Sequence, residues 1–155
     1  MGIRPAFRHH SSNELGAFDM NERLQGLKVV SFDVKDQAGD DTVIMFKVPG
    51  EPAGWEITEA SITLHSGFSA DGSNHITLTI ADAGSDGTGT TLIASRGGAS
   101  VAWAADGVYE FTMGSSDPYP IDADDWVALK WDETGTVAAT GTLGVVLAPG
   151  QRGTT

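Results

Sequence analysis

Apolar and polar residues alternate with a period of two along two stretches near the middle of the chain, residues 59–65 (EASITLH) and 76–80 (ITLTI). Such alternation is typical of a β-strand with one buried and one solvated face. The Gly-, Ser-, Asp- and Asn-rich segment 67–74 between them predicts a turn, so we expect an antiparallel hairpin. A hairpin with a single apolar face is not stable alone in water, and a second sheet has to cover it. The apolar positions are Ala60, Ile62, Leu64, Ile76, Leu78 and Ile80.

Further short strands are predicted on both sides of this pair. Their ranges are 27–34, 42–48, 90–94, 108–113, 126–131 and 142–147. Segment 42–48 is apolar on both faces, which predicts a central strand. In segment 126–131 the residues Val127, Leu129 and Trp131 share a face that we expect to point inward. The two prolines of segment 117–120 predict a rigid connector, because proline donates no ladder hydrogen bond.

About eight short strands with turn signals between them, and no long helical pattern, predict an all-β fold. We expect an antiparallel β-sandwich of jelly-roll-like topology. Periodicity does not determine strand order, so an immunoglobulin-like order stays open, although the Cys and Trp pattern of antibody domains is absent.

The chain divides into three parts: an N-terminal arm (1–26), a β-sandwich domain (27–149) and a flexible C-terminal tail (150–155). The arm combines polar residues with more apolar side chains than a disordered tail usually carries, among them Phe7, Phe18, Met20 and Leu24. We expect it to become ordered against a partner; the alternative is a terminus that stays disordered.

Charge is distributed unevenly over these parts. The formal net charge is −12; residues 1–30 hold four basic and three acidic groups, whereas residues 31–155 hold five basic and eighteen acidic groups. So acidic a domain repels phosphate backbones, and nucleic acid is not an expected partner. No apolar run approaches the roughly 20 residues of a membrane span, so no membrane association is expected. With no cysteine in the chain, disulfides and thiolate metal sites are excluded.

Several acidic turns place oxygen ligands close together, at residues 71–74, 82–87 and 122–125. Calcium would need six to eight oxygens, whereas Asp, Asn and Gly are also what tight turns require. We favour turn chemistry and predict no metal or other cofactor. His65 and His75 would lie close together across the predicted hairpin, but zinc needs a third ligand that the sequence does not supply.

Enzymatic activity is not expected, since the chain contains no Gly-x-Ser-x-Gly elbow, no thiol and no marked pair of opposed acids. For a carbohydrate, the candidate contacts are aromatic: Trp103, Tyr119 and Trp126. Core packing is the commoner role of tryptophan in a small sandwich.

The layout from Thr42 to Leu147 resembles that of tailed-phage head decoration (cement) proteins. The segments that carry the resemblance are TVIMFKVPG (42–50), WEITEASITL (55–64), HITLTIADAG (75–84) with GTTLIA (89–94), YPIDADDWVALKWD (119–132) and TLGVVL (142–147). The span 42–147 covers roughly two-thirds of the chain, and no catalytic residue comes with the resemblance.

The resemblance implies a virion protein on the outer capsid surface that binds the major capsid protein, forms a homo-oligomer (a trimer) and stabilises the head by bridging capsid subunits. It also implies that the arm contacts the capsid. The arm residues expected to do so are Arg4, Phe7, Arg8, Leu15, Phe18, Met20 and Leu24. The alternative function is a carbohydrate-binding module or receptor-binding β-sandwich of a virion or secreted protein.

Overall fold

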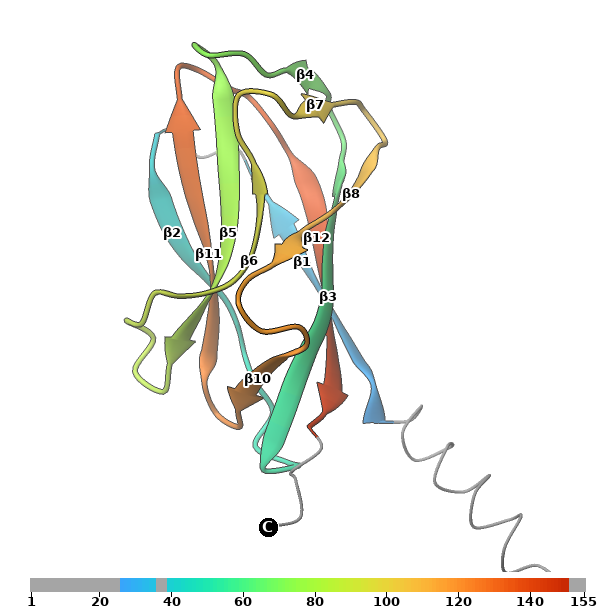
Figure 1. Ribbon diagram of the computed structural model, residues 1–155, viewed down its shortest axis with the longest axis vertical. Coiled ribbons are helices and arrows are strands. Elements are labelled where there is room, and N and C mark those ends of the chain that lie inside the picture. Colours follow the sequence, from blue (N-terminus) through green and yellow to red (C-terminus); the bar gives the residue numbers. More distant parts are fainter. Residues whose placement is uncertain (1–25, 36–38, 151–155) are drawn as a thin grey trace, which may run out of the picture.

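The computed structural model describes residues 26–35 and 39–150, and its strands form two packed sheets (Figure 1). The first sheet contains β1 (Lys28–Val34), β3 (Gly54–Leu64), β8 (Val108–Glu110), β10 (Tyr119–Asp122) and β12 (Gly141–Pro149). The second contains β2 (Asp41–Lys47), β5 (His75–Gly84), β6 (Thr91–Gly97), β9 (Thr112–Met113) and β11 (Trp126–Thr134). A small extra ladder joins β4 (Phe68–Ser69) to β7 (Ala102–Trp103).

The strand order is that of a jelly roll. The first sheet runs β1-β12-β3-β10, with β8 beside β3, and the second runs β2-β11-β5-β6-β9. Because β8 and β10 pair with different parts of β3, residues 61–63 and 54–57, they follow one another along one edge of that strand. All pairings are antiparallel. The predicted antiparallel sandwich is therefore confirmed, and the jelly-roll order replaces the immunoglobulin-like alternative.

Alternation in the sequence predicts correctly which side chains face the core. Apolar residues of β3, β5, β11 and β12 alternate into the core between the sheets, with a one-residue shift between Ile57 and Ala60 of β3, and all six apolar positions of the two central runs are buried there. In β11, Val127, Leu129 and Trp131 point inward, as expected. Each buried side chain of this size contributes about 1.5–3 kcal/mol, so these alternating positions are the main source of the driving force for folding.

The predicted hairpin between the two central runs is wrong. Residues 59–65 lie mostly in β3 of the first sheet and residues 76–80 in β5 of the second, so the runs face each other across the core. β3 pairs with β12 and β5 pairs with β11, both strands from the C-terminal third of the chain. His65 and His75 consequently lie in different surroundings. The His65 ring contacts the Thr142 hydroxyl at 3.2 Å, and the His75 ring contacts the carbonyl oxygen of Asp71 at 2.9 Å.

Strand β2 is an edge strand, which corrects the central position predicted for 42–48. Apolar residues occur on both faces of β2 because the strand contains a bulge, and not because it is central. The register with β11 shifts between Val127 and Ala128, so that Phe46 pairs with Val127 and Ile44 with Ala128, while Met45 has no partner. Such a bulge disrupts the strict alternation of side chains. Met45 and Phe46 both pack against the core, whereas Ile44 is 40% exposed.

Two further segments differ from expectation. The predicted strand 108–113 is split at the buried Phe111, so that β8 pairs in the first sheet and β9 in the second. Segment 117–120, predicted as a connector, contributes its second half to β10, where Pro120 pairs with Glu56. Proline is tolerated there because β10 lies at the edge of its sheet.

β1 begins and β12 ends at the same end of the sandwich, which we call the terminal end; the connection between β2 and β3 and strand β10 also lie there (Figure 1). The predicted arm contacts Arg4, Phe7, Arg8, Leu15, Phe18, Met20 and Leu24 lie outside the described residues. None of the helices in the described part of the chain has the length and hydropathy of a membrane span.

Candidate functional site

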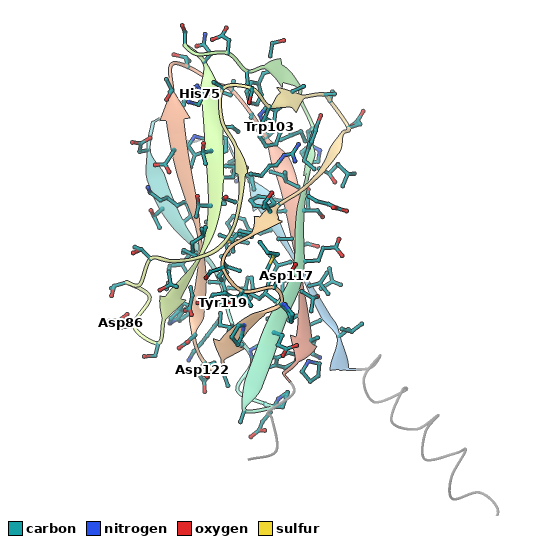
Figure 2. The ribbon with its side chains drawn as sticks, viewed as in Figure 1. His75, Asp86, Trp103, Asp117, Tyr119 and Asp122 are labelled. Atoms are coloured by element: carbon teal, nitrogen blue, oxygen red, sulfur yellow. The ribbon has the colours of Figure 1, made fainter. Side chains whose placement is uncertain are left out.

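The terminal end of the sandwich contains a cavity lined by both sheets. Its volume is about 340 Å³, and it is lined by Gly54, Trp55, Glu56, Asp82, Pro120, Ile121, Asp122, Asp125 and Gly150. Strand β5 positions Asp82 there because the inward positions of that strand end at this residue, where the core opens toward solvent. Figure 2 shows Tyr119 and Asp122 at this end, on β10.

Tyr119 and Asp82 join the two sheets across the cavity. The Tyr119 hydroxyl donates a hydrogen bond to Asp82 Oδ2 at 3.1 Å, and Asp82 Oδ1 accepts one from the Gly84 amide at 2.9 Å. Burial, together with the Asp82 charge, raises the pKa of Tyr119 to about 12. The phenol therefore remains protonated, and remains a donor, over the whole physiological range.

Asp125 is the second perturbed group of the cavity. Its pKa is raised by burial first, and then by the charges of Asp82, Asp122 and Asp124. Because the folded state disfavours its ionised form, Asp125 stabilises the fold most below pH 3.8 and less as the pH rises through its raised pKa. Of the polar groups lining this cavity, Tyr119 and Asp82 are the pair whose hydrogen bond joins the two sheets.

Trp126, one of the predicted sugar contacts, lies on the outer face of the second sheet near this cavity. The Lys47 ammonium lies 5.6 Å from the centre of its ring, and it also forms an ion pair with Asp124 at 3.3 Å. Tyr119, another predicted contact, is half-buried and directs its hydroxyl to Asp82. The structure thus brings Tyr119 and Trp126 to the same end of the molecule, although on different sheets.

Trp103 lies at the opposite end, on β7 (Figure 2). It is only 3% exposed, with Phe68 stacked at 5.8 Å and Tyr109 edge-on at 5.0 Å between ring centres. No open ring face is left for a sugar, so this placement argues against the predicted contact at Trp103. Arg96, which sequence reasoning missed, lies against both Trp103 and Tyr109. One feature of the sequence could have drawn attention to Arg96: it is the one arginine between residues 24 and 151.

An apolar row crosses the outer face of the second sheet. The register aligns Ile44, Ala128, Ala81 and Leu92 on four adjacent strands. The two alanines are buried although they lie outside the core cluster, while Ile44 and Leu92 at the ends of the row are 40% and 44% exposed. The row therefore leaves two large apolar side chains facing solvent.

The acidic turns use their carboxylates for local backbone bonding. Asp71 accepts hydrogen bonds from the amides of Ser73 and Asn74, and Asp86 accepts one from the amide of Thr88. These bonds lower the pKa of both carboxyl groups. Within the described ranges, no group of three or more His, Cys, Asp or Glu side chains is placed to hold a metal ion.

Sequence comparison identifies no relative of this chain. No model of a known protein family matches the chain, and no curated protein is detectably similar to it. Among solved structures, a chain of the acidic stable capsid structure of Helicobacter pylori bacteriophage KHP30 superposes with a TM-score of 0.54 and 12% identity, over 79% of this chain and 86% of that one.

Two other capsid structures superpose less well. A chain of the cyanophage Pam1 capsid asymmetric unit has a TM-score of 0.48 and 14% identity, over 80% of this chain and 85% of that one. The VP2 subviral particle of infectious bursal disease virus has a TM-score of 0.35 and 15% identity, over 79% of this chain and 32% of that one. At such identities the likeness to the KHP30 chain establishes a shared fold.

Proposed function

We propose that this chain is a structural protein of a virion and that it decorates the outer surface of a phage head, which it stabilises by bridging capsid subunits. The observation that carries the proposal is the jelly-roll strand order, together with its likeness to a chain of a phage capsid over most of both chains. The layout that resembles head decoration proteins lies within this same sandwich. Such a role is adhesive and requires no catalytic centre or cofactor.

The charge of the body favours the outer surface over the inner one. The described residues contain five basic and seventeen acidic side chains. A body with this balance would be repelled by packaged DNA, whereas on the outside the repulsion between copies keeps them apart until specific contacts form.

The arm is proposed to bridge to the neighbouring capsid subunit. It leads into β1 at the terminal end, beside the last residues of β12: a side chain added at Gly26 would meet the Pro149 ring at 2.6 Å. An arm that leaves the body at one end can bind a second subunit while the body binds the first. Several weak contacts of this kind, repeated in a trimer, sum to tight attachment.

Cosedimentation tests this proposal with empty heads assembled from the major capsid protein of the phage whose genome encodes this chain. The full chain is expected to sediment with the heads, and a variant that begins at Leu27 is expected to remain in the supernatant. A variant lacking residues 151–155 is the matched control, because that segment follows Gly150, which lies at the same end; it should bind like the full chain.

Thermal melting establishes whether the truncated body is folded. A folded body without the arm that binds heads as well as the full chain would contradict the bridging role. A full chain that does not bind heads at all would contradict the decoration function itself. Sedimentation equilibrium of the bound and free protein tests the trimer.

A further inference from the structure

Arg96 has an unusual environment for the single arginine of the described part of the chain. It lies near the end of β6, and its guanidinium is 5.3 Å from the ring centre of Tyr109 and 5.9 Å from that of Trp103. Tyr109 belongs to β8, in the other sheet. The two rings fix the guanidinium in the gap between the sheets, because stacking on aromatic faces is favourable for its planar cation.

The hydrogen-bonding capacity of Arg96 is largely unused. One terminal nitrogen donates a long bond of 3.4 Å to the carbonyl oxygen of Glu110, and Nε is buried without a hydrogen-bond partner. The lysines at positions 47 and 130 form ion pairs, but Arg96 pairs with no carboxylate of the described residues. In so acidic a chain, an arginine without an acidic partner is free to bind an external anion.

A cleft of about 590 Å³ lies beside Arg96. Its walls carry mainly hydroxyl groups and backbone, with a small apolar patch and no carboxylate. The lining residues are Thr77, Ser95, Arg96, Gly97, Ser100, Val101, Ala102, Tyr109 and Thr112. Gly97, in the wall of the cleft, has a φ of 144°, and a Cβ there would meet the backbone of β5, with the Cα of Thr77 at 2.6 Å, so this position requires glycine.

We infer that this cleft binds an acidic sugar, with the carboxylate of the sugar on Arg96 and its hydroxyl groups on the serine and threonine hydroxyls. A single cation matches the single charge of a uronic or sialic acid. The hydroxyl groups of Thr77, Ser95 and Thr112 are both donors and acceptors, as a polyol requires. Val101 and Ala102 offer an apolar contact to the carbon face of the ring or to an acetyl methyl group.

Other anions fit less well. A phosphate or sulfate dianion would be expected to require more cationic or amide donors than Arg96 alone supplies. An acidic peptide would be held mainly by a strand edge or an extended groove, whereas most of the polar side chains that line this cleft are hydroxyls. The site also differs from the candidate aromatic contacts Trp103, Tyr119 and Trp126, since charge and hydroxyl groups provide the recognition.

Isothermal titration of the full chain with N-acetylneuraminic acid and with glucuronic acid tests the inference. We expect saturable binding of at least one of them, with a dissociation constant in the millimolar range that is usual for a monosaccharide in an open site. Glucose and N-acetylglucosamine, which lack the carboxylate, should bind at least about tenfold more weakly. Amide resonances of residues 95–102 and 109–112 should shift on binding.

Three variants assign the contacts. Arg96→Gln should weaken binding of the acidic sugar about tenfold or more, and Arg96→Lys should restore part of it, because the charge returns without the planar fork. Thr112→Val removes a hydroxyl of the cleft without touching the aromatic contacts, and it should weaken binding several-fold with an unchanged melting temperature. Lys130→Gln, which removes an exposed cation paired with Asp132, is the matched control and should bind normally.

Absence of saturable binding to either acid, or equal binding of neutral sugars, would overturn the inference. The inference would also be overturned if neither Arg96→Gln nor Thr112→Val changed the affinity for the sugar acid. Sulfate that bound as tightly as the sugar acids, and competed with them, would overturn it as well. If Arg96→Gln does not fold, the Thr112→Val result decides whether the acidic sugar binds in this cleft. The variant that begins at Leu27 should bind the sugar like the full chain, which separates this site from attachment to the capsid.

Discussion

At the scale of single residues, Tyr119 links the two sheets where the hydrophobic core ends. Its hydroxyl reaches Asp82 from the opposite sheet, and both side chains are partly buried. A hydrogen bond to a charged acceptor is stronger than a neutral one, but partial exposure reduces its net contribution. The pair therefore closes the terminal end through polar contact, where the alternating apolar positions stop.

Tyr119→Phe is expected to reduce the free energy of unfolding by about 1 kcal/mol at pH 7, because Asp82 loses a donor in a partly buried site. Urea denaturation of Tyr119→Phe, Asp82→Asn and the double variant measures the coupling of the pair. A coupling energy of zero would contradict the linking role.

Ionisation of Tyr119 gives a second readout. Its folded pKa of about 12 exceeds the ordinary value of 10.0, so its stabilising contribution is complete below pH 10 and is lost as the pH rises toward 12. The chain contains two tyrosines, so Tyr109→Phe leaves Tyr119 as the single phenol. Ultraviolet titration of tyrosinate in that variant should give a midpoint near 12; a midpoint near 10 would show that the phenol is not buried beside a charge.

At the scale of elements, β12 shows how closely the strands of the first sheet approach each other. It pairs on one side with β1 and on the other with β3. Gly141 opens the strand in a buried position, where an added Cβ would meet the carbonyl oxygen of Thr63 at 2.6 Å. Gly144, in the same strand, has nothing within 4 Å of such a Cβ. The two glycines thus differ in the room that an added side chain would have, although neither has a left-handed φ.

Gly141→Ala is expected to destabilise the fold by about 1–3 kcal/mol, the usual cost of forcing an extra carbon into a packed site. Gly144→Ala should be neutral or should stabilise by up to about 1 kcal/mol, since alanine reduces the entropy of the unfolded chain. Thermal and urea denaturation of both variants measures the difference. Equal effects at the two positions would show that the close approach of Gly141 to β3 is not a packing constraint.

At the scale of the whole molecule, the dominant property of the body is its negative charge. With seventeen carboxylates and five cations in the described residues, net repulsion among the excess carboxylates destabilises the compact state, because folding brings like charges closer together. Increasing salt from about 10 mM to about 150 mM shortens the screening length from about 30 Å to about 8 Å. Screening on that scale acts between charges on different strands as well as between neighbours.

Sodium chloride is therefore expected to raise the melting temperature by a few degrees over that range, since about 1 kcal/mol corresponds to about 2–4 °C for a chain of this size. Magnesium chloride at equal ionic strength is the control for specific cation binding. A similar rise in both salts supports screening. A melting temperature that stays constant or falls would contradict net repulsion, and a much larger rise in magnesium would point to a bound cation.

The order of the alternating residues was enough to predict the class of fold and most of the buried side chains. A strand with one dry face has a period of two wherever it lies, so residues such as Ile62, Leu78 and Leu129 could be placed in the core without knowing their neighbours. The candidate contacts were less predictable. Tyr119 owes its role to Asp82 in another sheet, and Arg96 owes its role to Tyr109, and no local pattern records either pairing.

The sequence by itself therefore determined the β class, the inward faces and the acidic surface, because each depends on local alternation or on composition. Only the tertiary structure decided which strands pair, and it separated β3 from β5, put β2 at an edge and split 108–113 between two sheets. The physical reason is that a strand satisfies its backbone hydrogen bonds with any antiparallel partner. Long-range packing of the two apolar faces selects among partners, and that selection is a property of the assembled sandwich.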